Sequence, residues 1–180
     1  GMGYKKMAID LDIAPIEAKE MLKEFREKVP FMQGMLEDVM NRANKVGSIR
    51  TYLGRRCQFN LWEPNWFEVD PVTKQPVFHK ALPHGEANIK WSGSIKRAGT
   101  YKALNRLIQG TAADQTKKAM VDVYEKLGII PLIQVHDELN CSVKSDKEAK
   151  EIKNIMETCI DLTVPSNVDY KIKDNWGDAK

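Results

Sequence analysis

The sequence has little cysteine, little histidine and no long apolar run, and each shortage excludes a class of protein. Its three cysteines, Cys57, Cys141 and Cys159, are widely spaced, which excludes a disulfide framework and indicates a reducing compartment. His79 and His84 have no acidic or cysteine partners at metal-binding spacing, which argues against a zinc site. No N-terminal stretch resembles a signal peptide, and no run reaches membrane-spanning length. We therefore expect a soluble, cytoplasmic chain, or part of one.

The charge balance is nearly even, with a formal net charge of +3 over 180 residues. Nucleic-acid-binding proteins often concentrate basic residues on one face, and this net charge neither shows nor excludes such a face. Hydrophobic residues make up 42% of the sequence, which is enough for a core in one or two domains. The sequence has no internal repeat and no low-complexity tract.

The first 50 residues are predicted to be mostly helical. Pro15 suits the first turn of a helix, and apolar residues then recur at helical spacing up to Pro30, namely Ala18, Met21, Leu22, Phe25 and Val29. A second amphipathic helix is predicted over residues 31–45, before Gly47, with four residues facing inward: Met35, Leu36, Val39 and Ala43. The methionines at 21, 32, 35 and 40 are interpreted as core residues, because a flexible thioether fills irregular gaps.

Residues 57–95 are predicted to form a loop-rich insertion with one short hairpin, because proline and turn residues interrupt this segment repeatedly. The segment is also rich in aromatic residues: Trp62, Trp66, Phe67, Phe78 and Trp91. These residues are interpreted as a small satellite core or as a contact surface for a partner. Stacking on single-stranded template is the alternative.

A long helix is predicted over residues 104–127, where apolar residues follow helical spacing and Gly128 can end the helix. The small side chains of Ala112 and Ala113 would let this helix approach a strand closely. A last helix is predicted to begin at the capping box Ser145-Asp146-Lys147-Glu148, with Ala149, Ile152, Met156 and Ile160 facing inward.

Between these helices lies a predicted hairpin with two adjacent acids at its tip. Residues 129–135 form a strand-like apolar run that is rich in β-branched side chains, and residues 139–143 alternate apolar with polar side chains. Asp137 and Glu138 therefore lie at the predicted turn, where a carboxylate can face a ligand. An ordinary polar turn is the alternative, because Asp is common in hairpin loops.

Two motifs, about 25 residues apart, together resemble a known family. Gln109-Gly110-Thr111-Ala112-Ala113-Asp114 and Val135-His136-Asp137-Glu138-Leu139 resemble the C-terminal palm of family A DNA polymerases, the bacterial polymerase I-like group. Further segments resemble parts of this family. Gly1-Met2-Gly3 resembles the glycine-rich sequence that follows the fingers helix, and Thr51-Tyr52-Leu53-Gly54-Arg55-Arg56 resembles the segment between fingers and palm. Val164-Pro165 and Asn175-Trp176 resemble the last strand and the C-terminus of the family. The long insertion favours a phage lineage.

The resemblance implies an α+β fold, in which a helical fingers-derived part packs with a partial palm made of an antiparallel β-hairpin and flanking helices. It divides the chain into a helical fingers-derived segment (1–56), the insertion (57–95) and a C-terminal palm segment with the catalytic hairpin (96–180). The implied function is template-directed DNA synthesis, by nucleotidyl transfer from a dNTP to a primer 3′-hydroxyl with two Mg²⁺ ions.

The resemblance assigns the catalytic residues to the predicted turn. Asp137 maps onto a metal-ligating carboxylate of the family, and magnesium prefers such oxygen ligands. Glu138 maps close to the same site, where it could contact the metal ion through a water molecule. His136 maps onto a contact near the primer terminus, and a turn histidine satisfied by the backbone is its alternative.

The resemblance also implies DNA contacts. Gln109 maps onto a residue that touches the primer-template minor groove, and Asn105 lies one helical turn earlier. Arg55 and Arg56 are assigned to phosphates, with ordinary solvated arginines as the alternative. At Tyr101 many bacterial members have Arg, so the corresponding contact is either lost or replaced by Lys102.

The second essential carboxylate, from a family motif of the type Asp-Tyr-Ser-x-Ile-Glu, is absent from the sequence. Asp10 and Asp12 are not expected to replace it, because they match a helix connection. The fingers helix that grips the nucleotide, the thumb and an exonuclease domain are also absent. We therefore expect the chain alone to be catalytically incomplete, with binding of Mg²⁺ by this part alone in doubt.

The expected partners are primer-template DNA, dNTP and the N-terminal part of the polymerase, as a separate chain or a missing segment. The expected location is the cytoplasm of a bacterial cell or of a phage-infected host. A split product would expose an apolar surface and self-associate. The competing interpretation is a non-catalytic DNA-binding or regulatory module derived from a polymerase palm. A stand-alone metal nuclease is a weaker third, because it too would need a second carboxylate near Asp137.

Overall fold

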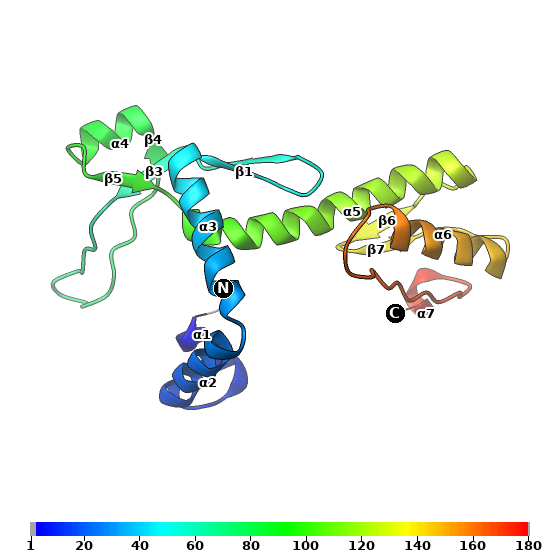
Figure 1. Ribbon diagram of the computed structural model, residues 1–180, viewed down its shortest axis with the longest axis horizontal. Coiled ribbons are helices and arrows are strands. Elements are labelled where there is room, and N and C mark those ends of the chain that lie inside the picture. The colour runs from blue at the N-terminus through cyan, green and yellow to red at the C-terminus, as the bar shows by residue number, and fades with distance from the viewer. Residues whose placement is uncertain (1–2, 180) are drawn as a thin grey trace. The chain divides into compact units, whose positions relative to one another are not determined.

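The computed structural model describes residues 3–179 (Figure 1), and these form two compact units, which divide between residues 108 and 109. Helices alternate with short antiparallel sheets along the chain, which confirms the predicted α+β class. No helix within the described residues is both long and apolar enough to cross a membrane. The segment Gly1-Met2, part of the predicted post-fingers motif, lies outside the described residues.

The first unit begins with three helices, α1 (Tyr4–Leu11), α2 (Pro15–Lys28) and α3 (Pro30–Val46). A proline begins each of α2 and α3, as its fixed φ and missing N–H allow. Gly47 ends α3 in the left-handed conformation, with a φ of 73°. The two predicted helices and their start and stop signals are therefore confirmed.

The predicted inward face of these helices is only partly buried. Met21, Phe25 and Met35 are 41%, 50% and 36% exposed, so interpreting Met21 and Met35 as core residues is wrong. Ala18 is the fully buried residue of α2, and α2 contacts α1 and α3. Within the described residues these neighbours cover only part of the apolar stripe of α2, so its larger side chains stay at the surface.

The core of the first unit includes the C-terminal part of α3, where Ala43 packs with Ile49, Phe59 and Ala103. Strand β1 (Ser48–Arg50) pairs antiparallel with β2 (Arg56–Gln58) and places Ile49 in this core.

The segment 57–95 is more ordered than the predicted loop with one hairpin. Strand β3 (Leu61–Pro64) lies between β4 (Leu82–Pro83) and β5 (Ile95–Arg97) in an antiparallel sheet, with α4 (His84–Lys90) attached. Trp91 and Ala87 are buried, as expected of a satellite core, whereas Phe67 and Phe78 are 75% and 90% exposed. The pairing of β3 with β4 and β5 spans long loops, which local turn signals do not reveal. A 3₁₀ turn, η1 (Thr100–Lys102), follows.

Arg97, at the end of β5, ties this sheet to the end of α3. Its Nε donates to the Asn44 carbonyl oxygen at 3.0 Å, and its Nη1 donates to the Phe59 carbonyl oxygen at 2.8 Å. The guanidinium carbon lies 4.6 Å from the centroid of the Trp62 ring. A Cβ at Gly47 would lie 2.7 Å from the Arg97 Cζ and Nη1 atoms. Position 47 therefore favours glycine for its positive φ, and a Cβ there would displace the Arg97 guanidinium.

Helix α5 (Ala103–Leu127) leads into the second unit, which continues with β6 (Ile133–Val135), β7 (Glu138–Asn140), α6 (Asp146–Thr158) and α7 (Trp176–Ala179). Gly128 ends α5 with a φ of 67°, as predicted. The core of this unit consists of Val123, Ile152 and Ile155. The predicted capping box is confirmed, because the Ser145 hydroxyl accepts from the Glu148 N–H and the Glu148 carboxylate accepts from the Lys144 N–H.

Three expectations for the second unit are corrected. Ala112 and Ala113 are exposed and do not line a close strand contact; the buried side of α5 instead includes Asp114, Thr116, Ala119, Asp122 and Val123. The first hairpin strand covers only three of the predicted residues 129–135. Residues 161–175 contain no strand, although the last strand of the family was expected there. A strand forms only where a neighbour pairs with it, and apolar sequence alone does not supply that neighbour.

The predicted division at residues 1–56, 57–95 and 96–180 stays a prediction. The two compact units meet at residues 108 and 109, within α5, and the first two predicted segments both lie inside the first unit.

Candidate active site

The predicted acidic tip is a tight hairpin turn in the second unit. Strands β6 and β7 pair so that Val135 lies opposite Glu138, which leaves His136 and Asp137 as the turn. His136 has a φ of 53°, in the left-handed region that non-glycine residues rarely adopt. The Gln134 side-chain amide donates to the His136 carbonyl oxygen and braces the turn.

The Asp137 carboxylate is available to a ligand. Asp137 is exposed, and within residues 3–179 its side chain has no hydrogen bond or ion pair. Glu138 is also exposed, but its Oε1 accepts from the Asn140 amide at 3.2 Å. The two acids line a cavity of about 510 Å³ whose other polar side chains include Asn140, Lys153, Asp169 and Lys171.

The metal-binding capacity of this site is limited. No group of three or more His, Cys, Asp or Glu side chains with metal-binding geometry occurs among the described residues. Magnesium prefers oxygen ligands and retains several waters, so Asp137 with nearby Glu138 fits a share of a magnesium site. A centre for two ions needs at least one further carboxylate.

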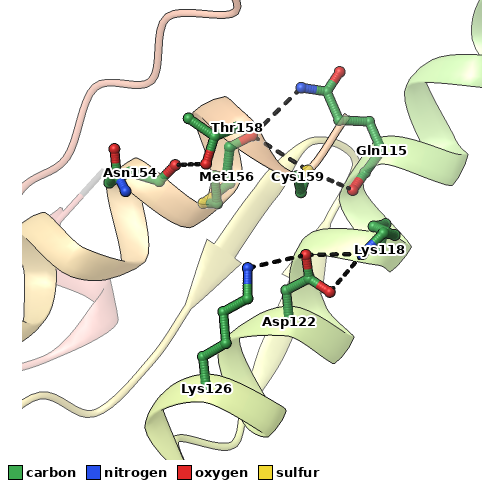
Figure 2. A network of polar contacts seen from close by, with 8 residues as sticks. All are labelled: Gln115, Lys118, Asp122, Lys126, Asn154, Met156, Thr158 and Cys159. Carbon is green, nitrogen blue, oxygen red and sulfur yellow. Dashed lines mark hydrogen bonds and ion pairs between the residues drawn. The ribbon is translucent and has the colours of Figure 1, made fainter. Parts of the chain in front are cut away.

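A polar network holds α5 against the end of α6 and the segment that follows (Figure 2). The buried Asp122 carboxylate accepts from Lys118 at 2.6 and 2.9 Å and lies 3.7 Å from Lys126. The hydrogen bond from Lys118 holds the pKa of Asp122 below its ordinary value, and the pKa of Lys118 is correspondingly raised. Lys118 lies one helical turn before Asp122 and Lys126 one turn after it, so the sequence spacing alone could have predicted these two ion pairs.

Gln115 makes the connection to the chain beyond α6. Its side-chain amide donates to the Ser166 hydroxyl at 2.8 Å and to the Met156 carbonyl oxygen at 3.4 Å. The Cys159 thiol donates to the Gln115 carbonyl oxygen at 3.6 Å, and burial raises the pKa of this thiol. These bonds fix the start of the segment whose residues 167–171 line the cavity beside Asp137.

The predicted phosphate-binding arginines lie on the β1–β2 hairpin of the first unit. The Thr51 N–H donates to the Arg55 carbonyl oxygen and the Arg55 N–H donates to the Thr51 hydroxyl, both at 3.0 Å, which closes the loop. Gly54 has a φ of 85°, which explains the glycine in this motif. Arg55 and Arg56 are both exposed.

Arg50 belongs to the same group and was missed from the sequence. It lies directly opposite Arg56 in the two-stranded sheet, and its Nη1 donates to the Gly54 carbonyl oxygen at 2.8 Å. Like charges opposite each other destabilise a sheet, so this pair does not stabilise the hairpin. Two adjacent guanidinium groups can instead bind an anion. Only the register of the hairpin, which the Thr51 loop sets, could have revealed the pair.

The predicted groove-contacting residues lie on and just before α5. Asn105 and Lys102 belong to the first unit and Gln109 to the second, and all three are exposed. Asn105 and Gln109 are one helical turn apart along α5. The Lys102 ammonium lies 5.3 Å from the centroid of the Tyr101 ring.

Comparisons with known proteins agree on one family. A family model described as DNA polymerase family A matches residues 1–178. A DNA-directed DNA polymerase of Pseudomonas phage M6 is 40% identical over 161 residues, which are 89% of this chain and 20% of that protein. The thermostable DNA polymerase I of Thermus aquaticus is 28% identical over 186 residues, covering 100% of this chain and 19% of that protein. This chain thus spans about a fifth of the length of these relatives.

A solved structure is also similar. It is the POL domain of Pol1 from M. smegmatis in complex with DNA primer-template and dNTP, with a TM-score of 0.62 and 26% identity. The match covers 92% of this chain and 26% of that chain.

Proposed function

Because the chain belongs to DNA polymerase family A, we propose that it acts within a template-directed DNA polymerase, which transfers a nucleotide from a dNTP to a primer 3′-hydroxyl. Its share of the active site is one metal-binding carboxylate, that of Asp137. The proposal depends chiefly on one observation: this carboxylate is exposed at a tight hairpin turn beside a cavity. The 40% identical phage relative also supports the predicted phage-type lineage.

Mg²⁺ is the proposed cofactor, and Asp137 is the residue that would hold it, with Glu138 nearby. When bound, the ion lowers the pKa of the primer hydroxyl and neutralises the triphosphate. The hairpin supplies the orientation, because strand pairing on both sides of the turn fixes the backbone that holds Asp137. The further carboxylate that two ions require is proposed to come from another part of the polymerase, which is the main proposed protein partner.

The DNA-contacting roles follow from side-chain chemistry. The exposed amides of Asn105 and Gln109 can accept and donate in the minor groove, where every base pair presents an acceptor. Arg55 and Arg56 would bind phosphates, which position the duplex without specifying sequence. Lys102 would take the phosphate contact beside Tyr101. His136 is proposed to lie near the primer terminus.

Exposed apolar residues of the second unit are proposed to face the rest of the polymerase. Ile130 and Leu132 are 63% and 65% exposed, and Ile133 and Val135 of β6 are 41% and 37% exposed. Without that partner, these residues favour self-association. In cells we expect the polymerase in the cytoplasm of a bacterium or of a phage-infected host.

A non-catalytic DNA-binding module is the second candidate function. It is favoured by one observation, that no three-residue metal-ligating group exists among residues 3–179. This alternative predicts that Asp137 is dispensable, whereas the polymerase proposal makes Asp137 essential.

Primer extension tests the proposal. The chain would be assayed with Mg²⁺, alone and mixed with the phage M6 polymerase truncated before the segment that matches this chain. We expect synthesis only in the mixture, lost in Asp137→Asn and retained in Asp174→Asn, an exposed carboxylate that does not line the cavity. A mixture that forms a complex by size-exclusion chromatography yet makes no DNA would refute the catalytic proposal in favour of the binding module.

A further inference from the structure

The first unit contains a second cavity, far along the sequence from the acidic hairpin. It has a volume of about 530 Å³ and lies among the end of α3, the sheet of the insertion and η1. Its aromatic, cationic and amide side chains come from all three places: Asn44, Trp62, Asn65, Lys96, Arg97 and Tyr101. A volume of this size falls within the range of small-ligand sites, about 300–1,000 Å³.

One side of this cavity is rigid. Arg97 is held by its hydrogen bonds to the Asn44 and Phe59 carbonyl oxygens and by the Trp62 ring. A guanidinium has five N–H donors, and the bonds to protein atoms within residues 3–179 use two of them. The remaining donors of this fixed fork suit a phosphate, because the fork matches two phosphate oxygens at once. Lys96 adds a second cation, which lies 3.9 Å from the carboxylate of Glu63, a residue that also lines the cavity.

The other side of the cavity offers an aromatic surface. The Tyr101 ring is 65% exposed, and the Lys102 ammonium lies 5.3 Å from its centroid. An exposed ring beside cations is the combination that binds single-stranded nucleic acid, since the ring stacks on a base while the cations bind the backbone. The Asn44 and Asn65 amides can hydrogen-bond to the edge of such a base.

From these features we propose that this cavity binds one unpaired nucleotide, with its base on Tyr101 and its phosphate at Arg97 and Lys96. The bound nucleotide could belong to a single-stranded stretch of DNA or be a free nucleotide. The site goes beyond the polymerase function proposed above and does not depend on Asp137.

The test is fluorescence anisotropy of the full chain with a labelled oligothymidylate of about 12 nucleotides, within the usual range of site sizes. Tyr101→Leu should raise the Kd by roughly 5- to 150-fold, the loss expected for one stacked base. Tyr101→Phe should restore binding. Phe78→Leu is the matched control, because Phe78 is an exposed aromatic residue of the same unit that lies outside the cavity.

The cationic side is tested independently of the aromatic side. Lys96→Gln should lower the slope of log Kd against log salt by about 0.7, as expected when one phosphate contact to a single strand is lost. Lys80 is an exposed lysine outside the cavity, so Lys80→Gln should leave the slope unchanged.

Two competitors distinguish the source and the chemistry. Competition by dTMP at a concentration near the Kd of the oligonucleotide would assign the site to a free nucleotide, and failure to compete would assign it to single-stranded DNA. The proposal is overturned if an abasic oligonucleotide binds as tightly as oligothymidylate, or if Tyr101→Leu and Phe78→Leu have the same Kd.

Discussion

Replacing Gly47 by alanine should destabilise the first unit through two separable effects. A φ of 73° disfavours any L-residue with a Cβ, by about 1–2 kcal/mol. The new methyl group would also lie 2.7 Å from the Arg97 guanidinium, which must move away from its carbonyl acceptors. Losing one hydrogen bond to a charged group adds about 1.5–3 kcal/mol. We therefore expect Gly47→Ala to lower the free energy of unfolding by about 2.5–5 kcal/mol in total.

Gly99→Ala is the matched control for this substitution. Gly99 has a φ of 69°, and a Cβ there would meet nothing within 4 Å. Gly99→Ala should therefore lower the free energy of unfolding only through the unfavourable positive φ, by about 1–2 kcal/mol. A double-mutant cycle with Arg97→Met gives a second check, because Gly47→Ala should then cost only the same about 1–2 kcal/mol.

Urea unfolding followed by tryptophan fluorescence measures these differences. Of the four tryptophans, Trp62, Trp66 and Trp91 lie in the first unit. In a Trp176→Phe background the signal therefore reports on this unit alone. Equal destabilisation by Gly47→Ala and Gly99→Ala, or additivity in the cycle, would refute the close approach of Arg97 to the α3 C-terminus.

Three further predictions concern the second unit. Ser145→Ala removes the cap of α6 and should lower the free energy of unfolding by about 1 kcal/mol, measured by urea denaturation; an unchanged midpoint would contradict the cap. Because the pKa of Asp122 is lowered mainly by its bond from Lys118, its stabilising effect should be complete above about pH 4–5 and disappear as the pH falls through the lowered pKa. Thermal unfolding of Asp122→Asn should lack that part of the acid dependence, and an identical profile would exclude the effect. Gln115→Ala should speed hydrogen exchange in residues 161–171, because the bond to Ser166 is lost, and unchanged exchange there would show that other contacts hold the segment.

The parts of the fold that could be predicted from the sequence depend on contacts within a few residues. Gly47 and Gly128 end helices, Pro15 begins one, and Ser145 with Glu148 forms a cap, each through a local backbone requirement. The position of Asp137 at a turn was predictable for the same reason, since apolar runs on both sides define the hairpin. Its role as a metal ligand came from the family resemblance and stays a proposal.

The features that the sequence did not reveal depend on distant pairs. Arg97 contacts a carbonyl 53 positions away along the chain, and no pattern near either residue indicates that contact. The sheet of the insertion likewise joins β3 to strands beyond long loops. The exposure of Phe25 has a related cause, because helical periodicity gives the apolar face of a helix but not whether another element covers it.

Position 136 has two requirements that favour different residues, one from its backbone conformation and one from its side chain. At a φ of 53° a glycine or an asparagine would suit the turn better, and a histidine there holds the hairpin less firmly by about 1 kcal/mol. In exchange, the residue next to Asp137 has an imidazole ring, whose two nitrogens can hydrogen-bond to a ligand. A substitution that stabilises this turn would thus remove the imidazole from beside the proposed metal ligand, so improving the stability of the hairpin and preserving its chemistry are competing aims.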